Sequence, residues 1–352
     1  DKTIYAYNIE NEITYAFQTV ESQQIPLSED IKNITNIYAD ESGVYITDRD
    51  LKKVVKYDHN LNYSGFCLCS FSNDEGRFNA PASVNSAGGK VAVADSNRIQ
   101  IIVGDTITQH YLGFKAGYAF STGGGDIIAI KNNNIFRNDF YSPIEWQSSQ
   151  IKDAKLDAED TLFILTDTSV YTMDDLLYFE KLFDISGGIK LAVNNKTHDV
   201  YVLTQQSILI YKNNVLFQTI PLSDVTEGDC GFVSIETDFE GNIYLLCQDY
   251  DSNGAAIVKI VSDGETDVFL LGDEMNKDIK SLSIDYISGD VYFVSESAHA
   301  VYMVQKSDLD VAVASDIPQI SLPANPENSL QDYNAEVIII GGYPSKMSYP
   351  FS

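Results

Sequence analysis

The sequence is poor in positive charge and has no long hydrophobic run. It carries 23 basic against 51 acidic residues, which gives a formal net charge of −28. Such a surface repels phosphate backbones and anionic lipid, so the composition argues against nucleic acid and against an anionic membrane as partners. No apolar stretch is long enough to cross a bilayer, so no transmembrane segment is expected. The acidic excess also favours solubility, whatever the partner.

Familiar catalytic and metal-binding patterns are missing as well. No Cys-x-x-Cys pair exists, which argues against a structural zinc site. The four histidines follow no repeated spacing and none lies in a His-Glu-x-x-His pattern, so a histidine metal cluster is not expected. No Gly-x-Ser-x-Gly turn is present to support serine hydrolase chemistry. No long stretch shows the 3.6-residue periodicity of a helix, which predicts an all-β protein.

Cysteine is scarce, with four in 352 residues. Cys67 and Cys69 are two apart on an expected strand, so their side chains point the same way and do not easily bridge each other. Cys230 and Cys247 bracket an expected hairpin, which leaves a cross-strand approach open. The other interpretation is that all four are small buried hydrophobic side chains.

The chain is rich in one feature, a short apolar strand that recurs behind a turn. Seven copies begin at residues 44, 91, 127, 162, 200, 243 and 291, with spacings of 35 to 48 residues. Most follow a turn containing Gly, Asn or Asp, which tolerate the positive φ of a tight hairpin. A period of roughly 40 to 45 residues with several strands per unit is typical of a β-propeller, in which four-stranded antiparallel blades pack around an axis.

We predict seven blades over residues 1–316, with the strand-like runs in residues 3–27 closing the ring. Eight blades follow if this N-terminal segment forms a blade of its own, and six follow if one weak unit is not a blade. The third unit is the weakest, with glycines at 123–125 before its strand and asparagines at 132–134 after it. These glycines lack the Lys and the following helix of a phosphate loop, so a hairpin turn is expected there.

One unit, residues 76–103, resembles the NHL repeat. The matching residues are Gly76, Phe78, Pro81, Ala94-Asp95-Ser96 and Asn97-Arg98-Ile99-Gln100. The first unit keeps Asp48 and Arg49 after its strand, and the fourth keeps Asp167. The resemblance implies an NHL-like propeller over most of the chain, without naming a subfamily. Some propellers of similar repeat are calcium-dependent lactonases with a Glu, an Asn and an Asp on the axis, and no such triad can be placed here.

Polar residues follow the recurrent strands, where the loops of a propeller line one rim of its channel. The rim candidates for ligand binding are Asp48, Arg49, Asp95, Arg98, Asp167, Asp249 and Glu296. This mostly acidic set suits a cation, a sugar or a basic peptide. The same residue types also suit hairpin turns that bind nothing.

A calcium-loop pattern begins at Asp249, where Asp251 and Asn253 follow at alternate positions before Gly254. Hard oxygen ligands converge in this way around a sharp turn. Isoleucine stands at the ninth and twelfth positions, where later ligands are needed. The segment is therefore either a plain solvent loop or a weak calcium site with borrowed ligands, and no other cofactor is expected.

The ends of the sequence differ from its middle. Prolines and polar residues after residue 316, followed by an apolar run at 335–341, indicate that residues 317–352 form a linker and an extra strand leading to a possible further module. The alternative is that residues 337–340 return to the propeller edge as an extra outer strand. The missing initial Met suggests a removed signal peptide or a trimmed chain. Sequons at Asn33, Asn62 and Asn195 are compatible with secretion.

Together these features favour a non-enzymatic binding propeller of a secreted or cell-surface protein, which engages a protein or a glycan through its rim. The alternative is a calcium-dependent, lactonase-like hydrolase with a cation on the channel axis. The absence of a recognisable catalytic motif favours the binding role over the enzyme.

Overall fold

The computed structural model describes residues 2–8, 13–19, 23–26, 34–40, 43–60, 77–87, 90–103, 106–112, 114–144, 150–174, 177–226, 230–248, 255–261, 266–270, 279–286, 288–295, 300–309, 338–341 and 345–348. The chain divides into two compact units, one of residues 22–306 and one of residues 1–21 with 307–352.

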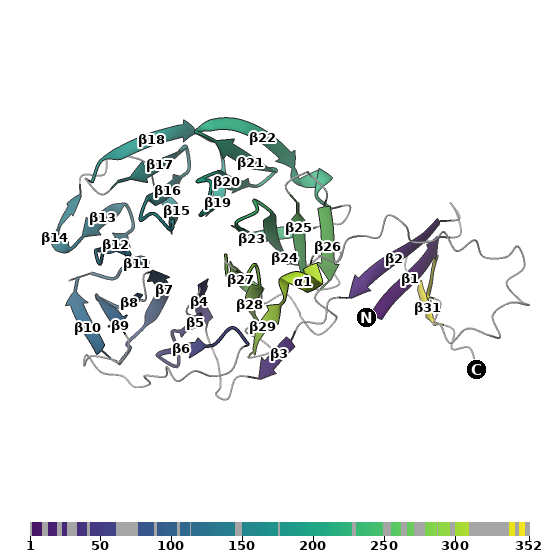
Figure 1. The fold of residues 1–352 in the computed structure, drawn as a ribbon, viewed down its shortest axis with the longest axis horizontal. Helices are drawn as coiled ribbons and strands as arrows, with labels where there is room; N and C mark the ends of the chain where they lie inside the picture. The colour runs from purple at the N-terminus through teal and green to yellow at the C-terminus, as the bar shows by residue number, and fades with distance from the viewer. Residues whose placement is uncertain are drawn as a thin grey trace, which may run out of the picture. The chain divides into compact units, whose positions relative to one another are not determined.

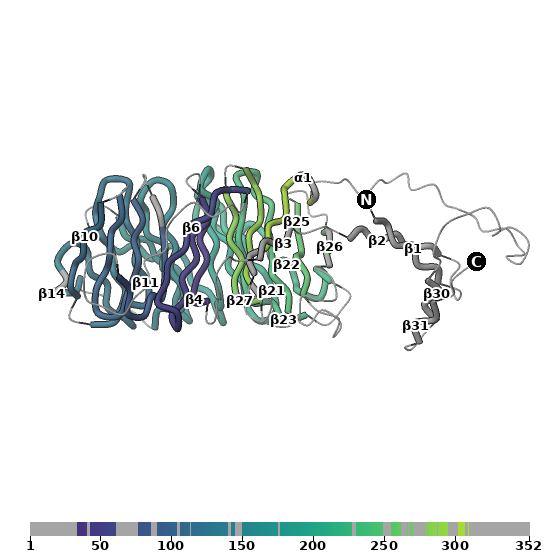
Figure 2. Tube along the Cα trace, turned by 90° about the horizontal axis from the view of Figure 1, so that it is seen from below, coloured from purple at the N-terminus to yellow at the C-terminus, as the bar shows by residue number. Residues whose placement is uncertain are grey.

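Residues 22–306 form a ring of seven antiparallel sheets, a seven-bladed β-propeller (Figure 1). The predicted fold class is confirmed, and the alternatives of six and eight blades fall away. Blade 1 has three described strands, and the outer strand expected at residues 63–68 lies outside the described residues. The strands run between two faces, where the hairpin turns gather (Figure 2).

The first four blades take their strands in chain order from the axis outward. Blade 1 contains β4 (Ile34–Asp40), β5 (Gly43–Asp48) and β6 (Lys53–Tyr57). Blade 2 contains β7 (Pro81–Ala87), β8 (Lys90–Asp95), β9 (Arg98–Val103) and β10 (Thr106–Tyr111). Blade 3 contains β11 (Tyr118–Ser121), β12 (Ile127–Lys131), β13 (Asn134–Arg137) and β14 (Asp139–Ile144). Blade 4 contains β15 (Ile151–Leu156), β16 (Leu162–Thr166), β17 (Ser169–Met173) and β18 (Phe179–Asp184).

The last three blades follow the same plan, except at the closure. Blade 5 contains β19 (Gly188–Val193), β20 (Val200–Thr204), β21 (Ser207–Lys212) and β22 (Val215–Pro221), and the 3₁₀ turn η1 (Leu222–Asp224) follows it. Blade 6 contains β23 (Gly231–Thr237), β24 (Ile243–Gln248), β25 (Ala256–Ile260) and β26 (Thr266–Leu270). Blade 7 contains β27 (Ile279–Ile284), β28 (Val291–Ser295), β29 (Ala300–Val304) and β3 (Gln23–Pro26), and the short helix α1 (Lys306–Leu309) follows β29.

The ring is closed by β3, which pairs antiparallel with β29 and places Ile25 opposite Val301. This strand lies within residues 3–27, the segment expected to close the propeller, but the strand-like runs of that segment at 3–7 and 13–20 correspond to β1 (Lys2–Asn8) and β2 (Ile13–Thr19), which belong to a separate sheet. The limits of the propeller unit differ from the expected 1–316, because residues 1–21 group with 307–352 instead. In that second unit β1 pairs along its whole length with β2.

The second unit is a four-stranded sheet in the order β2-β1-β30-β31. Strand β30 (Ile338–Gly341) pairs parallel with β1 and antiparallel with β31 (Ser345–Ser348). It falls within the apolar run at 335–341. Strands β1 and β30 pair with each other, and their other edges pair with β2 and β31, so neither strand belongs to a propeller blade.

The recurrent strand of the sequence is the second strand of each blade. Every residue of β5, β16 and β20 is buried. Apolar clusters fill the spaces between neighbouring blades, and Val44 and Ile46 of blade 1, for example, share one with Tyr292 and Met303 of blade 7. A strand that packs on both faces has no exposed positions to alternate with, so it reads as a continuous apolar run.

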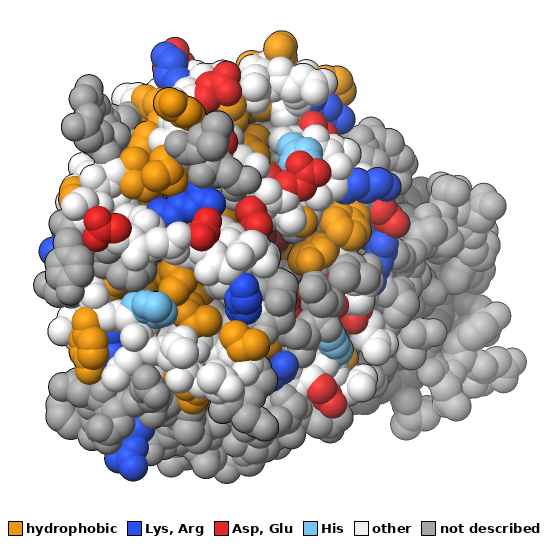
Figure 3. Space-filling view, turned by 60° about the vertical axis from the view of Figure 1, so that its left-hand side comes forward, with side chains coloured by type: hydrophobic (Ala, Val, Ile, Leu, Met, Phe, Trp, Pro, Cys, Tyr) orange, Lys and Arg blue, Asp and Glu red, His pale blue; other side chains and the backbone are white. Residues whose placement is uncertain are grey.

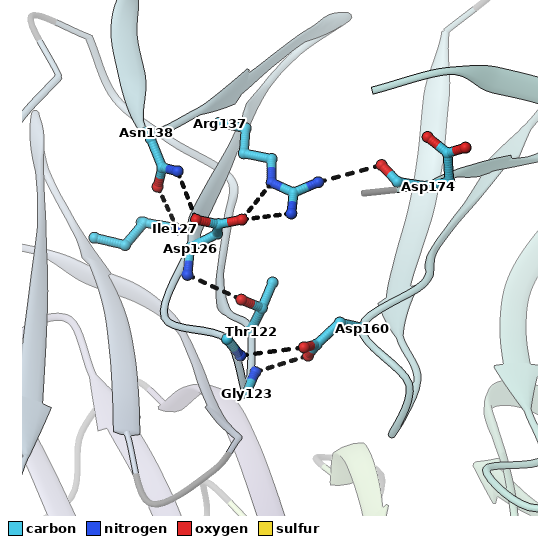
Figure 4. A network of polar contacts seen from close by, with 9 residues as sticks. Thr122, Gly123, Asp126, Ile127, Arg137, Asn138, Asp160 and Asp174 are labelled. Atoms are coloured by element: carbon cyan, nitrogen blue, oxygen red, sulfur yellow. Dashed lines mark hydrogen bonds and ion pairs between the residues drawn. The ribbon is translucent and has the colours of Figure 1, made fainter. Parts of the chain in front are cut away.

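The glycine run of blade 3 forms a hairpin turn between β11 and β12, as expected, with Gly125 at φ +97°. Two of its backbone N–H groups donate to the carboxylate of Asp160 in the next blade, Gly123 at 2.7 Å and Gly124 at 3.3 Å (Figure 4). Successive N–H groups of this kind make an anion-binding concavity. Here the anion is the Asp160 carboxylate of the protein itself, and the contact joins blades 3 and 4.

Candidate functional site in the central channel

The innermost strands of the seven blades surround a water-accessible cavity of about 190 Å³ at the centre of the ring. Alternate residues of a strand share a face, and six of the seven strands contribute lining positions two residues apart. The strand register sorts these residues into two rings. The first ring holds Asn36, Ser83, Tyr118, Asp153, Lys190, Ser234 and Ser281, and the second holds Tyr38, Asn85, Phe120, Lys155, Glu236 and Ser283.

A shared irregularity aims the first ring at the cavity. Six of the seven innermost strands carry a register shift near their first residues, for example between Ile151 and Asp153 in β15 and between Gly188 and Lys190 in β19. A β-bulge bends the strand and re-aims the side chain that follows it. Asp153 and Lys190 come directly after these shifts.

Several lining side chains connect one blade to the next. Their oxygens accept backbone N–H groups from the neighbouring innermost strand: Asn36 from Val84 at 3.1 Å, Ser83 from Ala119 at 3.2 Å, Asp153 from Leu191 at 3.1 Å, and Ser283 from Ala39 at 2.9 Å. The innermost strand of a blade has an edge that no strand of its own sheet covers, and these bonds satisfy part of it. The four side chains therefore hold the ring together.

Charge is unevenly distributed around the cavity. Blades 4, 5 and 6 contribute Asp153, Lys155, Lys190 and Glu236, which we call the charged wall. Among the described side chains, blades 7, 1 and 2 contribute amides, hydroxyls and apolar groups to the same cavity. The four charges of the wall sum to zero, although the whole chain carries −28. On the outer face in Figure 3, acidic and basic side chains lie among apolar and uncharged ones.

The charged wall is internally paired. Lys155 forms an ion pair with Glu236, and Lys190 lies 3.9 Å from Asp153. Burial opposes the charge of Lys155, but Glu236 and Asp153 outweigh it, so the pKa of Lys155 is raised. Burial raises the pKa of Glu236 against the effect of Lys155.

Tyr118 lies beside this wall and donates to Asp153 at 3.3 Å. Burial, with the nearby negative charge of Asp153, raises the pKa of the Tyr118 hydroxyl. The phenol therefore stays protonated at neutral pH and serves as a hydrogen-bond donor.

Two of the rim candidates, Asp95 and Arg98, lie in the interior of blade 2. Both side chains are fully buried and form an ion pair at 3.0 Å. Asp95 also accepts the backbone N–H groups of Asn79 and Ala80, each at 2.7 Å. The pair holds the segment before β7 in place and does not line the cavity.

The other rim candidates are spread over the loops. Asp48 is buried and accepts the backbone N–H groups of Asp50 and Leu51 at 2.9 Å, while Arg49 and Asp167 are exposed. None of the three lines the cavity. Asp249, Glu296 and the calcium-loop residues Asp251 and Asn253 lie outside the described residues, so their roles stay predictions.

The charged wall was missed at the sequence level because its residues precede the recurrent strands instead of following them. The available signal was alternation on the innermost strands, such as Asp153 and Lys155 at i and i+2 in β15. Within the described ranges, no group of three or more His, Cys, Asp or Glu side chains is placed to hold a metal ion.

A disulfide joins Cys230 and Cys247, which decides between the two interpretations for this pair. It fastens the start of β23, the strand that carries Ser234 and Glu236 into the cavity. Among the described residues no helix is long and apolar enough to cross a membrane.

Comparison with known proteins yields fold similarity alone. No family model matches the chain, and no curated protein sequence matches it. A solved streptogramin B lyase is 13% identical with a TM-score of 0.60, over 81% of this chain and 97% of that one. The extracellular domain of the hybrid two-component system BT4673 from B. thetaiotaomicron is 12% identical with a TM-score of 0.57, over 82% of this chain and 43% of that one. The fold is that of a seven-bladed β-propeller.

A chain of the mitotic checkpoint complex is similar to the same degree, with 10% identity and a TM-score of 0.57, over 82% of this chain and 95% of that one. Three proteins with such different names share this architecture, and function on a common fold resides in the site. The channel of this propeller must therefore be interpreted from its own residues.

Proposed function

We propose that this chain is a non-enzymatic binding propeller of a secreted or cell-surface protein, which takes a protein or a glycan at the mouth of its central channel. The observation that carries the proposal is the uneven lining of the cavity. A charged wall of net zero charge faces a wall of amides and hydroxyls, and such a concave, polar surface suits a ligand rich in hydrogen-bonding groups.

The pairing within the charged wall supports binding over hydrolysis. Asp153 and Glu236 each have a lysine as partner and lie in a cavity that tyrosine and serine also line. A cation on the axis would compete with these lysine ammonium groups for the same carboxylates. The wall is better suited to exchange hydrogen bonds with a polar ligand than to hold a divalent ion.

An extracellular setting agrees with the disulfide. Disulfides persist in oxidising compartments and are rare in the cytosol. The sequon at Asn195 lies in the β19–β20 turn, where Lys196 and Thr197 are exposed. A similar solved structure is the extracellular domain of BT4673. These observations support secretion or display at a cell surface.

The test is a parallel screen of the purified full chain against a glycan array and a panel of extracellular proteins. A Ser234→Trp variant fills the cavity beside the charged wall, and Thr219→Trp on the exposed outer strand β22 is the matched control. We expect at least one ligand that binds the parent and Thr219→Trp but not Ser234→Trp. If every ligand bound both tryptophan variants equally well, the channel would not be the binding site.

A further inference from the structure

Lys190 is the cation of the charged wall with the loosest attachment. Its side chain is 40% exposed, and its ammonium lies 3.9 Å from the nearest carboxylate oxygen of Asp153, beyond hydrogen-bond reach. That carboxylate already accepts from Leu191 and Tyr118. The Lys190 ammonium donates no hydrogen bond to a described residue, so its donors are available to a molecule in the cavity.

Asn85 lies on the uncharged side of the cavity, formed by blades 7, 1 and 2, and has an acceptor that lacks a donor in the described part of the chain. It belongs to the second ring, in β7, and is 6% exposed. Its side-chain oxygen is buried and has no hydrogen-bond partner among the described residues. A buried acceptor left unpaired destabilises the protein, and a donor from a bound molecule would relieve that cost.

The two groups lie on opposite walls, because Lys190 belongs to blade 5 and Asn85 to blade 2 of a seven-membered ring. A ligand that satisfies both needs an acceptor at one end and a donor at the other. Between them the cavity offers the hydroxyls of Ser234 and Ser281 and the ring of Tyr38. Hydroxyls with an aromatic ring suit the hydroxyl-rich body of a saccharide.

We propose that the channel binds a sugar acid, a saccharide that carries one carboxylate, with the carboxylate on the Lys190 ammonium and a ring hydroxyl donating to the Asn85 oxygen. This inference rests on the proposed binding function and narrows it to one ligand class. A single negative charge fits the wall, since a second one would face Asp153 or Glu236. The acidic outer surface is screened beyond about 8 Å at physiological salt, so it does not exclude a small anion from the cavity.

Titration calorimetry of the full chain with sodium glucuronate, and with the uncharged methyl glucoside as the matched neutral sugar, tests the proposal. We expect glucuronate to bind at least ten-fold more tightly than the glucoside. Lys190→Gln is expected to weaken glucuronate binding at least ten-fold and to leave glucoside binding unchanged. Asn85→Leu, which removes the unpaired oxygen, is expected to weaken both sugars.

Lys181→Gln is the control, because it makes the same change of charge on the outer strand β18, outside the cavity. It should bind glucuronate like the parent, and thermal melts should show that all three variants are folded. Equal affinity for the two sugars, or parental affinity of Lys190→Gln for glucuronate, would overturn the sugar-acid assignment.

Failure of this inference is distinguishable from failure of the proposed function. If neither sugar binds but Ser234→Trp still abolishes capture of some array or panel ligand, the channel binds a different class of molecule. If neither sugar binds and Ser234→Trp changes nothing in the screen, both proposals are wrong.

Discussion

Two acid–base pairs of this propeller have the same charges and opposite environments. Asp95 and Arg98 in blade 2 are fully buried at 3.0 Å, whereas Asp153 and Lys190 in the channel lie 3.9 Å apart with the lysine 40% exposed. The first pair satisfies backbone groups around it, since Asp95 caps two N–H groups and Arg98 donates to the carbonyl of Arg77. The second pair leaves its ammonium facing a cavity.

The comparison shows that the residues of the sequence repeat and the residues that line the channel are different sets. Asp95 and Arg98, which belong to the repeat-like pattern of blade 2, form their contacts in the interior of that blade. The residues that line the channel lie on the innermost strands, with the charged ones on blades 4 to 6, and belong to no recurring pattern. Four predictions test this division, from the largest expected effect to the smallest.

The replacement Arg98→Ala should cost the most, about 3–5 kcal/mol of unfolding free energy, because it leaves the Asp95 carboxylate buried without its cation. Lys190→Ala should cost less than about 1 kcal/mol, because its pair is loose and partly exposed. Urea unfolding of both variants measures the difference. Equal losses of unfolding free energy would show that the buried pair and the channel pair contribute equally to stability.

Replacing both Cys230 and Cys247 by serine should lower the unfolding free energy by about 2–4 kcal/mol, since the bridge restricts the unfolded chain. The bridge fastens β23, so channel binding should weaken along with stability. Thermal melts and ligand titration of the double-serine variant measure the two effects. Unchanged binding in the folded variant would mean that the charged wall does not depend on this anchor.

Removing the blade 3–blade 4 connection by Asp160→Ala should cost about 1–2 kcal/mol, because the N–H groups of Gly123 and Gly124 lose a charged acceptor (Figure 4). Both groups are near solvent, so water replaces part of the loss. Ligand affinity should not change, because Asp160 does not line the cavity. A lower affinity at full stability would place this turn in the binding site.

Acid should remove a small contribution from Asp126. Hydrogen bonds from Asn138 and Arg137 lower the pKa of this carboxyl below its ordinary value of 3.8 (Figure 4). Its stabilisation is therefore present above about pH 4 and is lost as the pH falls through the lowered pKa. Melting temperatures are measured between about pH 2 and pH 7, a range that includes the titration of carboxyl groups. The melting temperature of Asp126→Asn should fall less on acidification than that of the parent. Parallel curves would contradict this role.

The fold could be predicted because burial on both faces leaves a mark on composition. Strands such as β16 and β20 are buried at every position and apolar at all but their last, and the turns before them are rich in residues that tolerate positive φ. Counting those strands predicts seven blades. The propeller limits at 22 and 306 were not predictable, because β1 is as strand-like as β3 and only the choice of partner separates them.

The channel could not be predicted in the same way. Which residue of an innermost strand faces the axis depends on a bulge, and a one-residue shift moves a side chain to the other face. Lys190 follows such a shift, and nothing in Ile189-Lys190-Leu191 indicates it. The rim candidates stand at or after the end of the second strand, where Asp48 caps its own loop and Asp95 caps the segment before β7.

The pairing of β3 with β29 also determines when the propeller can close during synthesis. Ile25 leaves the ribosome long before Val301, its partner across the closing sheet. At roughly 5–20 residues per second, the early strand waits on the order of tens of seconds for its place. During that interval both it and the growing stack of blades present uncovered strand edges, which other chains can pair with. The last hairpin to emerge therefore completes the ring and ends the period in which the nascent protein is most prone to aggregate.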